Sequence, residues 1–283
     1  YKLKTESVFQ GGDTDLFFIS KHPDGGNFDN VSNVLFSVLS RIFVTIFMIT
    51  ASFCMAIGQS MNDLFPWCIV AYDVKDRTPM ERVELLSDMG FTKYAYDWRD
   101  RHLDDMSTEL NLMREAEIET IAVWLWLNAT RDSVGNLALA NKRVFEILKE
   151  TKTETTIWLS MSPNFFEDIS QSEAMKKATE FVHFIADEAS KINCSVALYN
   201  HTGWFANTSN QLEIIHALTA YDIRMVYSFH HAQSDVADFS EIAGKIVPYL
   251  VSVNLGGVKV EGPKVITIGE GDFEKEMIEQ LIR

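Results

Sequence analysis

Short apolar runs alternate with longer segments of helical periodicity along the chain after residue 58. The runs are rich in Val, Ile and aromatic residues and apolar on both faces, as expected for parallel strands covered on both sides. The predicted strands are Trp67–Tyr72, Thr92–Tyr96, Thr120–Leu127, Thr156–Leu159, Ser195–Leu198, Ile223–Tyr227 and Leu250–Leu255. Their spacing of roughly 30 residues is typical of βα units.

The segments between the strands have the apolar stripes of amphipathic helices. The first helix is predicted to begin after Thr78, because Pro79 suits the first helical position and Glu81 completes a capping box. Gly90 is a plausible end of that helix. Further stripes are centred on Leu110 and Met113, on Val144–Leu148, on Phe181–Ile185 and on Phe273–Ile282.

Seven βα units are present, whereas a closed (β/α)8 TIM barrel needs eight. The last predicted helix runs directly into Arg283. The sequence therefore predicts an α/β TIM barrel over residues 59–283 that is truncated after the seventh βα unit and lacks its eighth strand. A doubly wound open sheet is the alternative, but no Gly-rich phosphate loop follows the first predicted strand.

The N-terminal part of the chain has a different composition. Val34–Ile57 is nearly unbroken apolar sequence with the single charge of Arg41, and Ala56-Ile57-Gly58 resembles a signal-peptidase site. We expect residues 34–58 to be a signal peptide or a membrane anchor. Residues 1–33 are polar and are expected to be a non-native or disordered leader. The expected location is therefore periplasmic or secreted, with membrane anchorage as the alternative.

Charge and cysteine content narrow the function classes. The net charge of −15 and pI of about 4.9 argue against a nucleic-acid partner, which would require a basic surface. Contact with a membrane is expected only through the N-terminal apolar segment, if it is not cleaved. Cys68 and Cys194 are expected near strand starts, away from the pocket, as inert thiols rather than as a disulfide.

Polar and aromatic residues gather at the carboxyl ends of the predicted strands, which open onto one face of a βα barrel. The candidate substrate-binding residues are Asn200, His201, Asn254, Trp124, Trp126 and Trp158. Aromatic walls combined with amides and imidazoles suit a small carbohydrate, because ring faces stack on C–H surfaces and polar groups bind hydroxyls. The alternative for each tryptophan is a place in the core.

The candidate catalytic residues are His231, His230 and Asp97. A histidine suits general acid–base chemistry because its ordinary pKa is near neutrality. Adjacent strand residues point to opposite faces, so only one of the two histidines is expected to face the barrel interior. Serine-nucleophile, zinc-protease and P-loop motifs are missing from the sequence.

Four motifs, in this order, resemble those of the xylose isomerase-like TIM barrels, the family of sugar (phosphate) isomerases and epimerases grouped with AP endonuclease barrels. The resemblance covers about residues 66–283. The motifs are Leu198-Tyr199-Asn200-His201-Thr202-Gly203, Ser228-Phe229-His230-His231, Val253-Asn254-Leu255-Gly256-Gly257 and Ile268-Gly269-Glu270-Gly271-Asp272.

The resemblance implies a barrel that moves a proton next to the carbonyl group of a sugar, with the help of a divalent metal. Members of the family hold this metal with two Glu, one Asp and one His. Tyr199, Ser228 and Asn254 occupy three of those positions here, and the fourth would follow Arg283. Asn200, His201 and His231 match the family pattern. We therefore expect no bound cofactor, with a divalent metal as the alternative.

Two functions remain open at this stage. The first is a sugar (phosphate) isomerase or epimerase-like enzyme that acts on a small carbohydrate by proton transfer. The second is a non-catalytic sugar-binding barrel that has lost the metal site of the family. Metal-dependent nuclease activity is disfavoured by the acidic charge of the chain.

Overall fold

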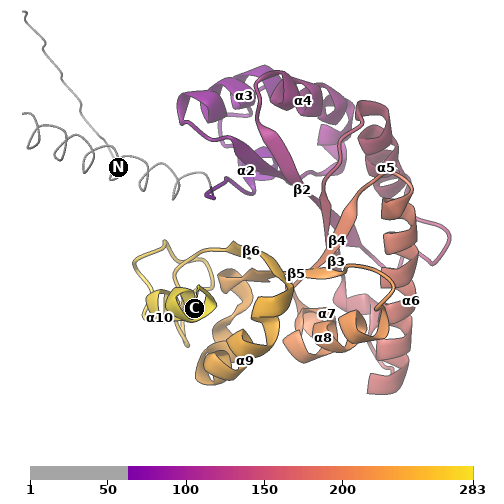
Figure 1. Cartoon of the computed structure of the whole chain (residues 1–283), viewed down its shortest axis with the longest axis vertical. Helices are drawn as coiled ribbons and strands as arrows, with labels where there is room; N and C mark the ends of the chain where they lie inside the picture. Colours follow the sequence, from indigo (N-terminus) through magenta and orange to yellow (C-terminus); the bar gives the residue numbers. More distant parts are fainter. Residues whose placement is uncertain (1–62, 283) are drawn as a thin grey trace, which may run out of the picture. The chain divides into compact units, whose positions relative to one another are not determined.

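The computed structural model describes residues 63–282. Six parallel strands form one sheet in which each strand pairs with the next one along the chain. The strands are β1 (Lys93–Tyr96), β2 (Glu119–Leu127), β3 (Thr156–Met161), β4 (Ser195–Tyr199), β5 (Arg224–Ser228) and β6 (Leu250–Asn254). The sheet is curved and the helices follow its outer side in chain order (Figure 1). This is the strand order of a partial TIM barrel.

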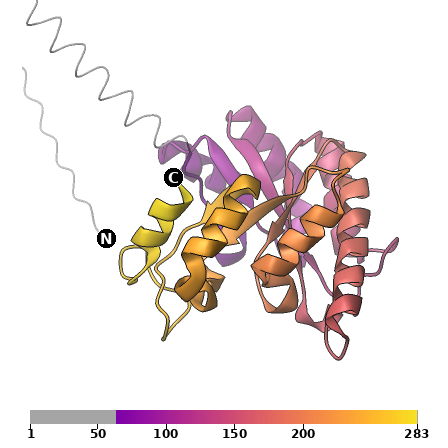
Figure 2. The ribbon, with the colours of Figure 1, turned by 60° about the horizontal axis from the view of Figure 1, so that its bottom comes forward.

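Helices connect successive strands. Contacts join α3 to α4, α4 to α5, α6 to α8, α8 to α9 and α9 to α10, and Figure 2 shows α8, α9 and α10 following one another. The longer helices are α3 (Pro79–Asp88), α4 (Leu103–Glu115), α5 (Leu139–Thr151), α6 (Gln171–Ser190), α8 (Thr208–Ala217), α9 (Phe239–Ile246) and α10 (Glu274–Leu281). Short helical turns are α2 (Ile69–Tyr72), η1 (Asp100–His102), η2 (Pro163–Phe165), α7 (Gly203–Ala206), η3 (Phe229–His231), η4 (Gln233–Asp238) and η5 (Val247–Tyr249).

The predicted start of the first helix is confirmed. The Thr78 hydroxyl accepts a hydrogen bond from the Glu81 amide, and the Glu81 carboxylate accepts one from the Thr78 amide. Pro79 lies at the first helical position. Gly90 follows the helix with a φ of +76°, a left-handed conformation that favours glycine.

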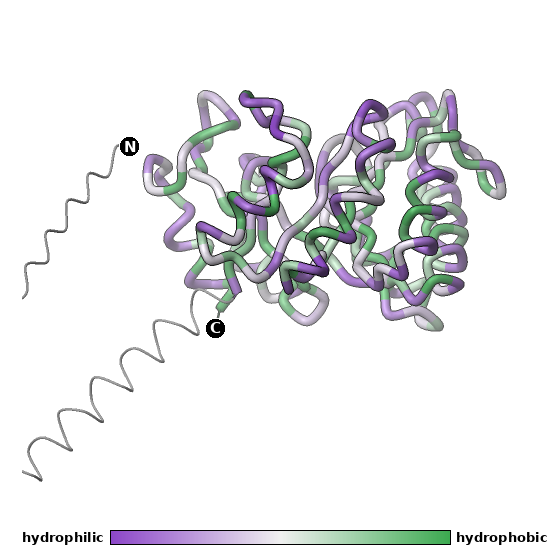
Figure 3. Tube along the Cα trace, turned by 90° about the horizontal axis from the view of Figure 1, so that it is seen from above, coloured by the Kyte–Doolittle hydropathy of each residue, from purple (hydrophilic) through white to green (hydrophobic). Residues whose placement is uncertain are grey.

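The outer face of the sheet packs against the helices to form the main core. Outward residues such as Leu125, Leu159 and Leu198 are fully buried there, together with Ile147 and Ile185 of the helices. Hydrophobic and hydrophilic residues alternate along the helices (Figure 3), as expected when one face is buried and the other meets water. This core fixes the strands and thereby fixes the direction of their carboxyl ends.

The inner face of the sheet forms a second, smaller cluster. Small residues at the amino-terminal side, including Ala95, Ala122 and Ala197, leave room for the buried rings of Trp158 and Tyr199. Strand side chains alternate between the two faces of the sheet. Every second residue toward the carboxyl end of a strand therefore also points to the inner face. That end carries the polar residues of the candidate site.

The predicted first strand, Trp67–Tyr72, is wrong. Cys68 has a φ of +62°, outside the range of a strand, and the short helix α2 follows it. The preceding Pro66 still lies beside β1, because its carbonyl accepts a hydrogen bond of 3.1 Å from the amide of Ala95. The other six strands are confirmed, with ends that differ from the predicted ones by up to two residues.

The predicted truncation after a seventh unit stays a prediction. The leader at 1–33 and the whole apolar segment at 34–58, with its cleavage site, lie outside the described residues. Within residues 63–282, no helix is both long enough and apolar enough to cross a membrane.

Candidate functional site

A pocket of about 500 Å3 lies at the carboxyl ends of the strands, within the usual size range of sites for small molecules. It combines inner-face residues of the sheet with the α2 region and the loop after β6. The residues that line it are Trp67, Cys68, Tyr72, Asp97, Arg99, Trp124, Tyr199, His201, His230, His231, Asn254, Leu255, Gly256, Lys264, Val265 and Ile266.

Asp97 is the buried acid of this pocket. It follows β1 on the inner face, is 1% exposed, and has a carboxylate oxygen 3.7 Å from Nη1 of Arg99. Burial raises the pKa of Asp97 to about 6, although the charge of Arg99 and the backbone amides of Val70 and Ala71 oppose this shift. Neither carboxylate oxygen makes a hydrogen bond of normal geometry with the described residues. Asp97 therefore retains acceptor capacity for a ligand, and its pKa of about 6 lies closer to neutrality than that of an ordinary aspartate.

Arg99 is held between aromatic rings at the wall of the pocket. Its guanidinium carbon lies 5.1 Å from the ring centroid of Trp124 and 5.4 Å from that of Tyr72, which are cation–π distances. Nη1 donates to the carbonyl of Trp98 at 2.6 Å, and Nη2 donates to the hydroxyl of Tyr72 at 3.2 Å. These contacts fix the cation beside Asp97.

Three histidines form a cluster in the same pocket. The ring centroids of His201 and His231 are 4.7 Å apart, and those of His230 and His231 are 4.6 Å apart. The expectation that only one of the two adjacent histidines faces the interior is wrong, because both belong to η3 rather than to β5. In a 3-10 turn, neighbouring side chains do not alternate by 180°.

Burial keeps these histidines neutral. It lowers the pKa of His201 to about 4 and that of His231 to about 3, and it also lowers the pKa of His230. Repulsion between the rings and the charge of Lys264 act in the same direction on His231. A neutral imidazole has one N–H donor and one acceptor nitrogen. Nδ1 of His201 is buried and has no hydrogen-bond partner among residues 63–282.

The positions that would hold a metal according to the resemblance form a different arrangement. Nδ2 of Asn254 donates a hydrogen bond of 3.1 Å to the hydroxyl of Tyr199, whose pKa is raised by burial. Ser228 contributes only a buried hydroxyl. A phenol, a hydroxyl and an amide do not provide the carboxylate and imidazole donors that divalent metals prefer. In residues 63–282, no three His, Cys, Asp or Glu side chains form a cluster suited to a metal. The donor set does not fit a metal.

Three predicted binding residues do not line the pocket. Asn200 lies on the outer face, where its side chain accepts a hydrogen bond of 2.6 Å from the amide of Ser228 and donates to the carbonyl of the same residue at 3.4 Å. Trp158 is buried inside the barrel, stacked on Tyr199. Trp126 lies next to the site, with its ring centroid 5.0 Å from that of His201.

Several lining residues were not among the sequence candidates. Arg99 lies three residues beyond Tyr96, the last residue of β1, so examining three residues beyond each strand end would have found it. Cys68 was expected away from the pocket, but it lines the pocket because its segment is not a strand. Lys264 lies ten residues beyond β6 in the loop before α10, and no local pattern points to it.

The loop that carries Lys264 is anchored by a buried carboxylate. Glu274 accepts hydrogen bonds from the backbone amides of Val258, Gly269 and Gly271 at 3.1, 3.0 and 2.9 Å. Gly257 is required at its position, because a Cβ there would lie 2.5 Å from the carbonyl oxygen of Thr267. This packing brings Val265 and Ile266 of the loop to the pocket.

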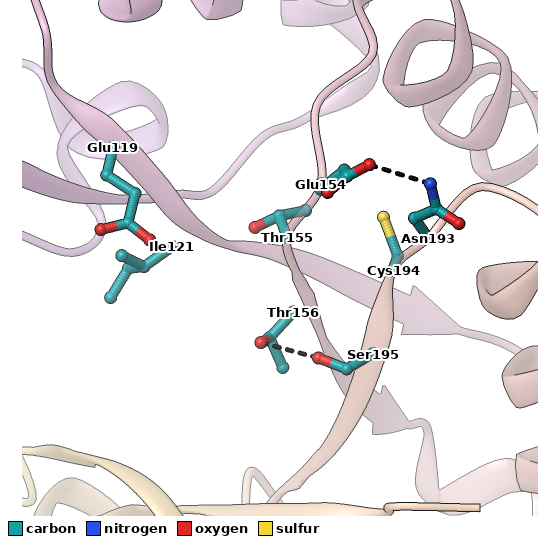
Figure 4. Close-up of a pocket in the computed structure, with 8 residues that line it drawn as sticks. All are labelled: Glu119, Ile121, Glu154, Thr155, Thr156, Asn193, Cys194 and Ser195. Atoms are coloured by element: carbon teal, nitrogen blue, oxygen red, sulfur yellow. Dashed lines mark hydrogen bonds between the residues drawn. The ribbon is translucent and has the colours of Figure 1, made fainter.

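A second pocket, of about 370 Å3, lies at the opposite ends of the strands (Figure 4). Its polar side chains are largely paired with one another. Asn193 donates to Glu154 at 2.8 Å, and the hydroxyls of Thr156 and Ser195 are 2.9 Å apart. The histidine cluster and Asp97 lie at the other end, so this pocket is not the candidate site.

Comparison with known proteins gives the fold. No protein family model matches the chain, and no curated protein matches its sequence. Among solved structures, a D-tagatose 3-epimerase-like protein is 16% identical, with 70% of this chain and 80% of that chain covered and a TM-score of 0.57. The 3-keto-D-glucoside 4-epimerase of E. coli is 13% identical, with 73% and 82% covered and a TM-score of 0.54.

The IolI protein, solved with a bound zinc atom, is 16% identical, with 73% of this chain and 80% of that chain covered and a TM-score of 0.53. At these identities the likeness shows a shared fold. The zinc of IolI is therefore a property of that protein, and the ligand positions here must be judged on their own side chains. The chain shares the fold of these solved structures, which confirms the fold implied by the resemblance of its sequence to the xylose isomerase-like TIM barrels.

Proposed function

We propose that the protein binds a small carbohydrate in the pocket at the carboxyl ends of its strands and moves a proton at a carbon next to the carbonyl group. The observation that carries this proposal is the convergence of Asp97, His201 and His231 with aromatic walls in one pocket. The sugar epimerases among the structural neighbours support the same reaction class.

Asp97 is the group best suited to take the proton. Its pKa of about 6 leaves it mostly ionised at pH 7 yet close to the pH of operation, where general bases are most effective. The low pKa values of His201 and His231 make both rings weak bases. This shifts the proton-transfer role from His231 to Asp97.

The two neutral histidines suit a different role. A neutral imidazole N–H can donate a hydrogen bond to a carbonyl oxygen and stabilise the negative charge that develops there. The carboxylate of Asp97 would take the proton from the carbon next to the carbonyl and return it on the same face to the former carbonyl carbon, while a hydroxyl proton passes from one oxygen to the other. No net gain or loss of protons or electrons results, as an isomerisation or epimerisation requires.

The aromatic residues favour a sugar over a purely polar ligand. Trp67, Tyr72 and Trp124 line the pocket, and the Nε1 of Trp124 donates to Ser160 at 3.1 Å. A tryptophan ring fixed in this way presents a flat apolar face to the C–H groups of a sugar ring. The amide of Asn254 and the free donors of the histidines are available for hydroxyl groups.

A non-catalytic sugar-binding barrel is the second candidate. It is favoured by the hydrogen bond between Asn254 and Tyr199, which joins two positions where the resemblance places metal ligands. Without a metal, an enediolate would be stabilised only by the hydrogen-bond donors and the two cations of the pocket, Arg99 and Lys264. Binding without turnover would then be the remaining property of the pocket.

Incorporation of deuterium from solvent distinguishes the two candidates. The full-length protein is incubated in D2O with a panel of ketoses and aldoses, and exchange at carbon-bound positions is followed by NMR. We expect exchange with at least one sugar, loss of exchange in Asp97→Asn, and unchanged exchange in Asp88→Asn, an exposed control at the end of α3. Retained sugar binding without exchange would leave only the binding function.

A further inference from the structure

The pocket is positively charged although the protein is strongly acidic. The chain has a net charge of −15, yet two cations, Arg99 and Lys264, line the pocket with a single carboxylate, Asp97. The three histidines there are neutral. At neutral pH these charges leave about one uncompensated positive charge in a cavity with aromatic walls.

The Arg99 guanidinium has N–H donors that are free to bind a ligand. A guanidinium carries five N–H groups in a planar fork. Two of them bond to the carbonyl of Trp98 and the hydroxyl of Tyr72. The side chain is 40% exposed, so the remaining donors can be reached from the pocket. Because its position is fixed by Tyr72 and Trp124, little conformational entropy would be lost when it binds an anion.

Lys264 reaches the same cavity from a different element. Its loop is tied to α10 through the three amides bound by Glu274, and Nε2 of Gln233 donates to the carbonyl of Lys259 at 3.0 Å. The ammonium is near enough to the histidine cluster to lower the pKa of His230 and His231. Two cations from distant parts of the chain therefore face one ligand volume.

We propose that the ligand is a monoanionic carbohydrate, a sugar acid whose carboxylate is bound by Arg99 and Lys264. This inference rests on the proposed carbohydrate function and adds the charge of the substrate. A carboxylate matches the planar fork of arginine and can accept two parallel hydrogen bonds from it. A phosphate ester carries about −1.5 to −2 charges at pH 7, which is more than the single excess positive charge can balance.

Calorimetric titration of the full-length protein with matched sugars tests the inference. Each uronic acid is compared with its parent aldose and with the corresponding sugar 6-phosphate, so that only the charged group differs. We expect at least one uronate to bind roughly tenfold to hundredfold more tightly than its parent aldose, as for a hydrogen bond to a charged group. The preference should shrink as salt concentration increases.

Three variants identify the residues responsible. Arg99→Gln and Lys264→Gln should each lower the ratio of uronate affinity to aldose affinity. Arg131→Gln is the matched control, an exposed arginine that does not line the pocket, and it should keep the full preference. Lys264 is exposed, so its replacement does not threaten folding, and circular dichroism verifies the fold of all three.

The outcomes separate the two proposals. Equal binding of uronates and aldoses, or tighter binding of the 6-phosphates, would overturn the sugar-acid inference and leave the carbohydrate function intact. A preference for uronates that survives both Arg99→Gln and Lys264→Gln would overturn the assignment of the two cations. Failure of every carbohydrate to bind would refute the proposed function, and this inference would fall with it.

Discussion

The side-chain amide of Asn254 donates a hydrogen bond of 3.1 Å to the hydroxyl of Tyr199, across the inner face of the barrel. The resemblance found in the sequence places metal ligands at both of these positions. In this chain their polar atoms bind each other, which gives a buried phenol a partner. The same bond orients the Asn254 amide at the pocket wall.

Replacing Tyr199 with Phe removes the acceptor of this bond and leaves the amide of Asn254 unpaired. We expect the free energy of unfolding to fall by about 0.5–1.5 kcal/mol, the usual net contribution of a hydrogen bond, because the Asn254 amide lines the pocket and can still meet water. Urea denaturation measures the change. Tyr249→Phe is the matched control, because its hydroxyl bonds to His216 in an exposed pair, and its effect should be much smaller. Equal losses in the two variants would contradict the role of the Tyr199–Asn254 bond.

The raised pKa of Asp97 makes its ionisation unfavourable to folding. The ordinary pKa of an aspartate is about 3.9, so between that value and about 6 the folded chain binds a proton that the unfolded chain has lost. The contribution of Asp97 to stability is therefore fully present below pH 4 and is lost as the pH rises through 6.

We accordingly predict that Asp97→Asn is more stable than the wild type at pH 7.5, by about 1–3 kcal/mol, and similar to it near pH 4. Urea unfolding at the two pH values checks this. The lowered pKa values of His201 and His231 affect the stability of the variant and of the wild type alike. The difference in stability between the two proteins therefore reports on Asp97. A variant that is less stable at pH 7.5 would refute the prediction.

Arg82 and Glu109 form a buried ion pair between α3 and α4. Nε of Arg82 donates to Glu109 at 2.9 Å, and the two side chains are 6% and 0% exposed. Glu109→Gln should cost about 3–5 kcal/mol, because it leaves the arginine buried without a counter-charge. The exposed pair of Arg143 and Glu150 provides the control, and Glu150→Gln should cost far less, because water and salt screen an exposed pair. Thermal and urea denaturation give both values.

Glu274 should control the order of the loop that carries Lys264. Glu274→Ala leaves the amides of Val258, Gly269 and Gly271 without their acceptor. Hydrogen exchange at these amides should accelerate, while the amides of β2 to β4 keep their protection. Glu276→Ala, an exposed neighbour on α10, should change neither. Unchanged exchange in Glu274→Ala would show that the loop is held by other contacts.

Six of the seven predicted strands were recovered from the sequence because each is a short apolar run covered by helices. The exception shows the limit of that signal. Trp67–Tyr72 is as apolar as the others, but Cys68 adopts a left-handed conformation that no hydrophobic pattern reveals. The general position of the pocket also followed from the sequence, since the carboxyl ends of parallel strands share one face.

The composition of the pocket was less predictable. Asn200 carries the right side chain at the right strand end, yet alternation along β4 turns it to the outer face while His201 faces the pocket. Both histidines after β5, His230 and His231, line the pocket because they belong to η3 and not to the strand. Lys264 depends on the path of a long loop, which no local pattern specifies.

The hydrogen bonds between Asn200 and the backbone of Ser228 have a consequence for the histidines that follow these two residues. They fasten the end of β4 to the end of β5. His201 directly follows Asn200, and His231 lies three residues beyond Ser228, at the end of η3. The gap between the two imidazoles is thus set by the scaffold before any ligand arrives. The two imidazole rings are therefore in place before a ligand binds, and no part of the binding free energy is needed to bring them together.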